Sequence, residues 1–221
     1  MVVPAHNEQQ LLPACLAALR TAATSVDTQL DIELIVVADS CDDATATIAE
    51  HAGAHVVPVD VRSVGRARVI GMDFALRRGT DGLWLATTDA DSRVPRDWLA
   101  WQRRHALDGA DLLVGAVTVT DWTPRPTHVR ELFEAQYRRR VVGAVHGHVH
   151  GANLGVAAAA YRRLGGFAPL PHSEDHDLLA RARRAGLRIV ADATCPVDTS
   201  ARRRSRAPNG FAAYLDTLTR H

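Results

Sequence analysis

Two aspartates one residue apart, Asp89 and Asp91, come directly after an apolar segment at residues 83–88. Such a segment predicts a buried strand, and open α/β sheets bind ligands at the carboxyl ends of their strands. Two carboxylates from one short loop can hold Mg2+ or Mn2+ and leave coordination positions free for phosphate oxygens. A solvated turn is the alternative, because aspartate is common after strands. The pair alone leaves both interpretations open.

A second acidic pair, Glu174 and Asp175, follows Ser173 at the expected start of a helix. Free backbone N–H groups and the helix dipole stabilise carboxylates in a first helical turn, so both side chains could be caps. A carboxylate in a cavity can also take the proton of an attacking hydroxyl group. Position alone favours the cap.

Three histidines, His146, His148 and His150, alternate along a segment expected to be extended, so their side chains could project from one face. Such a row can bind zinc, or one histidine can complete a metal site at Asp91. No matching ligand spacing elsewhere in the chain supports zinc, and a role in lining a pocket is favoured. The next residues, 151–153, could line the same pocket or form a plain turn.

Composition indicates an ordinary globular protein. The chain has 221 residues, of which 47% are hydrophobic and 23% charged, and its net charge is +1. This length fits one domain, or one and a half, and the charge provides no global basic field for nucleic acid. Three scattered cysteines and the lack of an apolar run of roughly 18 residues predict a cytoplasmic protein of a reducing compartment.

Strand-like and helix-like segments alternate through the first half, which predicts βαβ units and a mainly parallel sheet. The strand at residues 2–4 is short for a central strand, so we expect the native start to lie upstream of Met1. Further strands are expected at residues 32–37, 54–57, 83–88 and 112–119, with a last one around 189–190. Helices are expected from residue 7, after residues 42–45, at 66–77, from residue 95, and at 127–142, 157–164 and 173–185.

The order of the short motifs is more informative than any one of them. Residues 3–8 (VPAHNE), 37–45 (VADSCDDAT), 89–91 (DAD), 151–153 (GAN) and 174–175 (ED) resemble, in this order, the family 2 glycosyltransferases of the GT-A fold. The likeness covers residues 2 to about 204. It implies one GT-A domain over residues 1–221, an α/β fold with a Rossmann-like, mainly parallel sheet, helices on both faces and a mixed, less regular C-terminal half. Within it we expect a nucleotide-binding half at 1–108, an acceptor and catalytic half at 109–198 and an Arg-rich tail at 199–221.

The resemblance also implies an activity: transfer of a sugar from a nucleoside-diphosphate sugar to an acceptor hydroxyl, with inversion and with Mg2+ or Mn2+. Asp89 and Asp91 would hold the metal, and Asp175 beside Glu174 would act as general base. One departure from the family pattern is Ala38, where a second acid usually precedes Asp39. The nucleotide contacts implied are Pro4, Ala5, His6, Glu8, Asp39, Arg66, Asp89 and Ala90, and the donor-sugar contacts are Gly151, Ala152 and Asn153.

Physical chemistry supports these roles. A departing nucleoside diphosphate gains negative charge that a cation stabilises, and the attacking hydroxyl must lose a proton. Trp122, in a Pro-flanked loop, is a candidate platform for the acceptor. Three arginines at residues 202–204 could close over the diphosphate. The acceptor is expected to be a small molecule or a lipid-linked hydroxyl compound, with no nucleic acid partner.

Two other functions remain open. A sugar nucleotidylyltransferase would need a glycine-rich basic loop after the first strand to hold a triphosphate, whereas residues 6–10 read HNEQQ. A domain that binds nucleotide sugar without turnover is the second alternative. The two intact acidic pairs argue against it.

Overall fold

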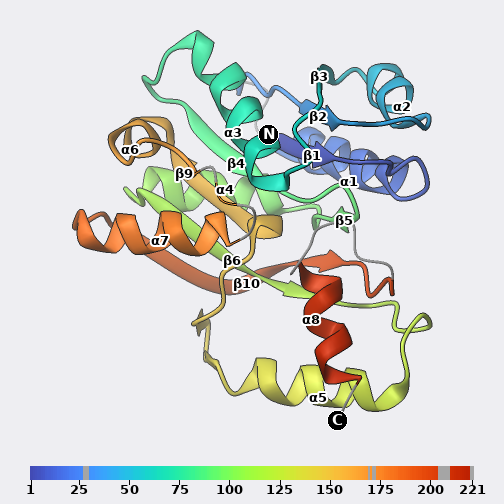
Figure 1. Cartoon of the computed structure of the whole chain (residues 1–221). Coiled ribbons are helices and arrows are strands. Elements are labelled where there is room, and N and C mark those ends of the chain that lie inside the picture. Colours follow the sequence, from blue (N-terminus) through green and yellow to red (C-terminus); the bar gives the residue numbers. More distant parts are fainter. Residues whose placement is uncertain (27–29, 169, 171–172, 204–209, 220–221) are drawn as a thin grey trace.

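The computed structural model describes residues 1–26, 30–168, 170, 173–203 and 210–219. Its backbone is drawn in Figure 1. The strands are β1 (Val2–Ala5), β2 (Ile35–Asp39), β3 (His55–Val59), β4 (Trp84–Thr87), β5 (Ser92–Arg93), β6 (Leu112–Thr118), β7 (Val141–Val142), β8 (Val145–His146), β9 (Leu154–Ala157) and β10 (Ile189–Thr199).

The α-helices are α1 (Leu12–Thr24), α2 (Thr45–His51), α3 (Val64–Ala75), α4 (Trp98–Leu107), α5 (Thr127–Arg138), α6 (Ala158–Arg163), α7 (Glu174–Arg184) and α8 (Phe211–Leu218). Two short 3-10 turns, η1 (Leu76–Arg78) and η2 (Gly151–Asn153), complete the described elements.

Eight of these strands form one sheet in the order β3-β2-β1-β4-β9-β6-β10-β5. The pairs β3–β2, β2–β1, β1–β4 and β6–β10 are parallel, whereas β9 runs antiparallel to both of its neighbours, β4 and β6. Parallel strands bring their carboxyl ends to one edge of the sheet. The ends of β1, β2 and β4, which carry the candidate nucleotide and metal residues, therefore lie at the same edge. The α/β fold with a mostly parallel sheet is confirmed.

Helices cover both faces of the sheet, as predicted. On one face α3, α6 and α7 bury Met72, Tyr161 and Leu178 against sheet residues that include Val37. On the other face α1, α2 and α4 bury a second apolar cluster together with Val36. Val36 and Val37 are neighbours on β2, so the alternation of side chains along a strand sends one to each layer.

Helix α3 approaches the sheet closely. A Cβ atom added at Gly71 would lie 2.4 Å from Val2 Cγ1 and 2.9 Å from Val37 Cγ2. Only glycine fits this contact without displacing the strands, and it sets the position of α3 over β1 and β2.

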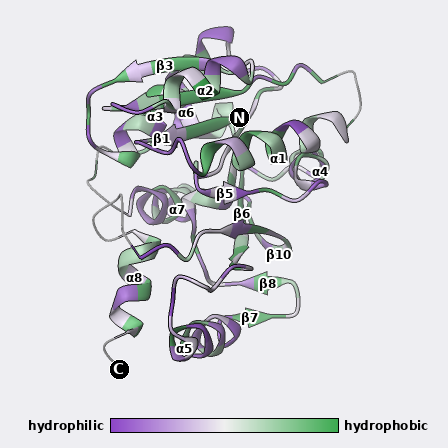
Figure 2. Cartoon of the chain, turned by 90° about the vertical axis from the view of Figure 1, so that its right-hand side faces the viewer, coloured by the Kyte–Doolittle hydropathy of each residue, from purple (hydrophilic) through white to green (hydrophobic). Residues whose placement is uncertain are grey.

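The C-terminal half adds a third, smaller layer. Helices α5 and α8 pack together below the main sheet, as Figures 1 and 2 show from two directions. Their shared cluster buries Val129, Phe133, Leu215 and Leu218. A short two-stranded sheet, β7–β8, lies beside α5.

Several expected elements differ from the observed ones. The first helix begins at Leu12, because Asn7 adopts a left-handed conformation with φ of 52° and a turn occupies residues 8–11. The helix expected over 127–142 ends at Arg138, since the valines that follow form a hairpin around Gly143 (φ 60°). The strand at 189–190 continues to Thr199. Strand β9 was not predicted, and the sequence placed residue 157 in a helix instead.

Among the described residues, no helix combines the length and the apolar run that crossing a membrane requires.

Candidate functional site

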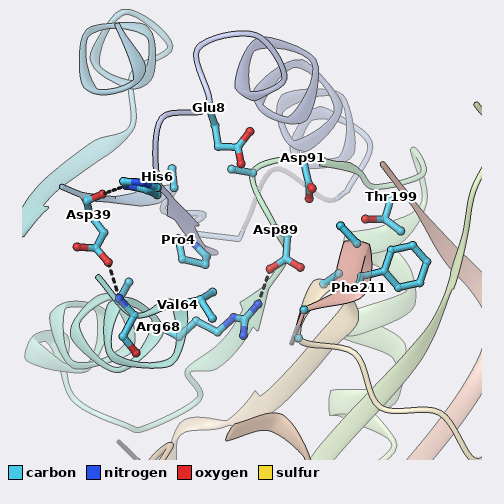
Figure 3. Close-up of a pocket in the computed structure, with 18 of the residues that line it drawn as sticks. Pro4, His6, Glu8, Asp39, Val64, Arg68, Asp89, Asp91, Thr199 and Phe211 are labelled. Carbon is cyan, nitrogen blue, oxygen red and sulfur yellow. Dashed lines mark hydrogen bonds and ion pairs between the residues drawn. The ribbon is translucent and has the colours of Figure 1, made fainter. Parts of the chain in front are cut away.

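A cavity of about 790 Å3 opens at the carboxyl edge of the sheet. It is lined by most of the residues singled out in the sequence. These are Pro4, Ala5, His6, Glu8, Asp39, Asp89, Ala90, Asp91, Gly151, Ala152, Glu174 and Asp175. Residues from the first strand to the start of α7 therefore meet at one place. Figure 3 shows several of them around the cavity.

The ends of β1 and β2 are tied together. His6 Nδ1 lies 2.7 Å from the carbonyl oxygen of Asp39. The Asp39 carboxylate accepts hydrogen bonds from the backbone N–H groups of Val61, Arg62 and Ser63 at 2.8–2.9 Å. Burial opposes ionisation of Asp39, but these three donors hold its pKa below the usual value. Asp39 thus stays charged and fixes the loop that leads into α3.

The two acidic pairs are joined by Arg68, whereas the sequence favoured its neighbour Arg66 as the basic residue of the site. The Arg68 guanidinium forms ion pairs with Asp89 through Nη2 and with Glu174 through Nη1. The Arg68 side chain is only 5% exposed, and Figure 3 shows it extending from α3 to Asp89. The helical spacing of Ala67, Gly71 and Ala75 marks the buried face of α3, and Arg68 lies on that face. That spacing was the available signal for Arg68.

Gly151 makes room for this guanidinium. A Cβ atom at Gly151 would lie 2.5 Å from Arg68 Cζ and 2.6 Å from both Nη atoms. The Gly151 N–H also donates to Asp175 Oδ2 at 2.9 Å. The glycine therefore contacts Arg68 on one side and positions the candidate base on the other.

Asp91 lies deeper than Asp89, with 13% of its side chain exposed against 33%. Arg202 from the C-terminal segment contacts Asp91 Oδ2 at 3.0 Å and Glu8 Oε1 at 2.6 Å. Burial raises the pKa of Asp91 to about 6; Arg202 opposes this shift, and Asp89 and Glu8 add to it. The cavity thus concentrates negative charge around Asp91.

The donor set at Asp89 and Asp91 fits a hard divalent cation. Both side chains offer carboxylate oxygens, the ligands that Mg2+ and Mn2+ prefer, and a cation would neutralise the crowded charge at Asp91. Within the described ranges, no group of three or more histidine, cysteine, aspartate or glutamate side chains is arranged to hold a metal. A cation held by these two carboxylates alone would have coordination positions left for phosphate oxygens and water.

Three predicted site residues lie outside the cavity lining. Arg66 is exposed on the opposite side of α3 from the buried face. The Asn153 side chain is fully buried. Its Oδ1 accepts from Trp98 Nε1, and its Nδ2 donates to the carbonyl groups of Ala116 and Cys195, at 2.8–2.9 Å. The structure thus corrects the expectation that Asn153 faces a donor sugar.

Trp122 is the third predicted site residue that lies outside the cavity lining. Its ring packs on Phe133 in the cluster between α5 and α8, and its Nε1 donates to the Val119 carbonyl at 3.0 Å. These contacts orient the indole toward the core, which corrects its assignment as an acceptor platform. Phe211 lines the cavity instead, together with Tyr214.

The three histidines do project from one face, in a stacked row. His148 stacks on Tyr137 with ring centroids 3.7 Å apart, and His150 lines the cavity. Burial, followed by the neighbouring histidines, lowers the pKa of His150 to about 3, so the ring is neutral. The Tyr137 hydroxyl accepts from Val117 N at 2.8 Å and lies 3.3 Å from His150 Nε2. The row is held by stacking and hydrogen bonds.

Of the three arginines that the sequence suggests could close over a diphosphate, Arg202 lines the cavity. Arg203 is exposed, and Arg204 falls outside the described residues.

The fold places this chain in the class of GT-A glycosyltransferase structures. A mannosyltransferase from Pyrobaculum calidifontis, solved with GDP-Man and Mn2+, matches with a TM-score of 0.64 and 17% identity over 99% of this chain and 59% of its own. The 1–349 fragment of S. aureus TarS, solved with UDP-GlcNAc, matches with a TM-score of 0.67 and 14% identity over 99% of this chain and 63% of its own. Glucosyl-3-phosphoglycerate synthase from Mycobacterium tuberculosis, solved with Mn2+, UDP and phosphoglyceric acid, matches with a TM-score of 0.62 and 22% identity over 99% of this chain and 73% of its own.

Residues 1–165 match the family model described as glycosyl transferase family 2, and the chain belongs to that family. No curated protein matches it. This chain spans about three-fifths of the length of the first two structures compared, 59% and 63%.

Proposed function

We propose that this chain transfers a sugar from a nucleoside-diphosphate sugar to an acceptor hydroxyl group, with inversion at the anomeric carbon. The observation that carries the proposal is the meeting of Asp89, Asp91 and Asp175 in one cavity, with Arg68 between the two acidic pairs. Family membership and the similar structures solved with GDP-Man, UDP-GlcNAc and UDP support a nucleotide-sugar donor.

The donor half of the cavity is suited to a nucleotide. Pro4, Ala5 and His6 form one wall and the charged Asp39 another, where it can accept a hydrogen bond from a base or a ribose hydroxyl. Asp89 and Asp91 would hold Mg2+ or Mn2+, which when bound neutralises charge on the departing diphosphate. The Arg202 guanidinium, beside Asp91, provides a positive charge in addition to that of the metal.

Asp175 is the proposed general base. Its Oδ2 accepts from Gly151 N and its Oδ1 from His176 N at 2.8 Å, so backbone donors hold the carboxylate in one orientation. Each oxygen keeps a lone pair for a hydroxyl proton. Glu174 is 3% exposed and pairs with Arg68, so it holds the first turn of α7 in position and its carboxylate is not available to an acceptor.

The decisive experiment separates donor binding from turnover. Titration calorimetry with UDP, GDP, TDP and ADP, each with and without Mn2+, should show metal-linked binding of at least one diphosphate. Asp175→Asn should keep that binding and lose about 100-fold or more of the hydrolysis or transfer rate of the matching sugar nucleotide. Asp91→Asn should lose the metal-linked part of the binding.

Asp177→Asn is the matched control, because Asp177 lies on α7 two residues further on and pairs with Arg181 away from the cavity. Near-normal turnover of Asp175→Asn would show that the base is another group. Metal-linked binding without turnover of any sugar nucleotide would favour a binding domain over an enzyme. The anomeric configuration of the product, read by NMR, tests inversion.

A further inference from the structure

The segment at residues 138–145 exposes apolar and basic side chains together. Within it, β7 and β8 form a hairpin in which Val142 pairs with Val145. These two valines are 79% and 62% exposed. Their neighbours in the pairing, Val141 and His146, face the other way, and His146 is buried with Nε2 3.0 Å from the Val114 carbonyl. The hairpin thus has an inner face fixed to the protein and an outer face of two valines.

The hairpin is held in place by its backbone. The Ala193 N–H donates to the Ala144 carbonyl at 2.7 Å, and the Gly147 N–H donates to the Arg140 carbonyl at 3.0 Å. Figure 2 shows the strands of this hairpin in the colour of hydrophobic residues, next to the hydrophilic helix α5, at the end of the molecule opposite β3. The exposed valines are therefore a fixed feature of this surface.

Three consecutive arginines, Arg138, Arg139 and Arg140, precede the hairpin and are all exposed. Within the described part of the chain, none of them forms an ion pair. The closest acid along α5, Glu134, pairs with Arg130. Asp192, near the hairpin on β10, binds Trp101 Nε1 and His105 Nε2, each at 2.8 Å. The positive charge beside the valines is left without a carboxylate.

We propose that the segment 138–145 docks this protein on an anionic lipid surface. Arginines bind lipid phosphates while a small apolar tip enters the boundary between headgroups and acyl chains, and the two contributions add. A second copy of the chain fits less well. Two valines provide only a small part of the surface of roughly 1,200–2,000 Å2 that a stable interface buries, and the three arginines would repel those of the other copy. Single-stranded nucleic acid is bound through exposed aromatic rings beside the basic residues, and this segment has valines there.

The docking segment lies close in the chain to the wall of the candidate active-site cavity, which connects docking with the proposed function. The chain leaves β8 and reaches His150 and Gly151 in the cavity wall within a few residues. Docking would hold that wall near the lipid surface, where a lipid-linked acceptor hydroxyl is presented. This last step rests on the proposed function, whereas the docking itself is tested without donor, metal or acceptor.

The test is co-sedimentation of the full chain with vesicles of phosphatidylcholine alone or of phosphatidylcholine mixed with phosphatidylglycerol. We expect binding only to the anionic vesicles, and weaker binding as salt is raised. Val142→Ser/Val145→Ser and Arg139→Gln/Arg140→Gln should each reduce the partition coefficient roughly tenfold or more. Leu107→Ser, at a leucine that is 70% exposed on α4, and Arg183→Gln/Arg184→Gln, exposed on α7, are the matched controls and should bind as the unmodified chain does.

The changed side chains are exposed, so circular dichroism and the melting temperature should stay the same. The proposal is overturned if the chain ignores anionic vesicles, binds neutral ones equally, or keeps its binding in both hairpin variants. Equal loss in the control variants would overturn it as well. Sedimentation velocity that shows a dimer dissociated by the valine variants would instead assign this surface to a second copy of the chain. Retention of a labelled oligonucleotide in place of vesicles would assign it to nucleic acid.

Discussion

Arg68 connects the two acidic pairs of the cavity, and its contribution can be separated from that of a neighbouring arginine. The guanidinium is almost completely buried between Asp89 and Glu174, and these carboxylates together hold its pKa above the ordinary value in spite of burial. Removing one member of a buried charge cluster leaves the others without compensation. Arg68 therefore matters for stability as well as for the shape of the cavity.

Arg68→Ala should lower the free energy of unfolding by about 3–5 kcal/mol, because Glu174 would remain buried without a positive partner. Arg66→Ala, two residues earlier on the exposed side of α3, should change it by less than about 0.5 kcal/mol. Urea unfolding of both variants measures the difference. Similar values for the two would contradict the assigned burial of Arg68.

Arg68 and Arg66 also show which site residues can be identified from the sequence alone and which cannot. The acidic residues are found from sequence because they follow apolar segments and come in a recognisable order. Choosing Arg68 over Arg66 needs the rotational phase of α3, and a helix turns by about 200° between residues two apart. The sequence favours Asn153 as a cavity residue because an amide can bind a sugar, but its two amide N–H groups donate to buried carbonyl groups and its amide oxygen accepts from an indole N–H.

Contacts between neighbouring helices and strands give two further expectations. Asp192 joins β10 to α4, since its Oδ2 accepts from Trp101 Nε1 and lies 2.8 Å from His105 Nε2. Burial would raise its pKa, but the hydrogen bonds from Thr194, Trp101 and His105 together lower it to about 2. Because the folded pKa lies below the unfolded one, this carboxylate stabilises the fold at neutral pH and does so less as the pH falls from about 4 to about 2.

Asp192→Asn should therefore lower the free energy of unfolding by about 2 kcal/mol at pH 7. Its difference from the unmodified chain should shrink as the pH falls below about 4. Urea unfolding at pH 7 and near pH 3 measures this, with Asp73→Asn, an exposed change on α3, as the control. A difference that stays constant across this range would exclude the proposed linkage.

Arg125 holds the C-terminal segment against the rest of the chain. Its Nε donates to the Ala201 carbonyl at 2.9 Å, its Nη2 donates to the carbonyls of Arg202 and Ala212, and its Nη1 pairs with Asp216. Arg125 thus links the residue that reaches Asp91 to the start of α8.

Arg125→Ala should leave buried carbonyl groups without donors and loosen α8. We expect amide hydrogen exchange over residues 211–218 to become roughly tenfold faster or more, with little change in α1. Arg130→Ala, at an exposed arginine on α5 that pairs with Glu134, is the control. Unchanged exchange in α8 would argue that the apolar cluster with α5 is sufficient to hold it.

Most elements of the first half were predictable because β1 to β4 are apolar segments and the helices between them show helical spacing; the start of α1 and the short strand β5 were not predicted. The second half was less so for identifiable reasons. Strand β9 has only four residues, L-G-V-A, too few to show a period, and its place between β4 and β6 depends on pairing with strands far away in sequence. Helix α5 ends at Arg138 because Val141 and Val142 pair across a glycine turn with His146 and Val145 instead of continuing the helix.

The two halves of the chain should unfold together. Strand β9 pairs with β4 of the first half and with β6 of the second, so the hydrogen bonds that join the two parts of the sheet are lost if either half unfolds. We expect one transition in urea, with tryptophan fluorescence and far-UV circular dichroism coinciding. Separate transitions for the two signals would show that the halves are independent domains.

The direction of β9 also determines where this fold tolerates changes in chain length. Because β9 runs opposite to β4 and β6, its first residue, Leu154, lies beside Thr87, the last residue of β4, and beside Val114 of β6. The polypeptide that precedes β9 passes through Gly151 and Ala152 in the cavity wall. Insertions or deletions between Thr118 and Gly151 would therefore remodel the cavity rim while the sheet register stays unchanged. The shape of the cavity rim can thus change through one stretch of about thirty residues without a change in the sheet.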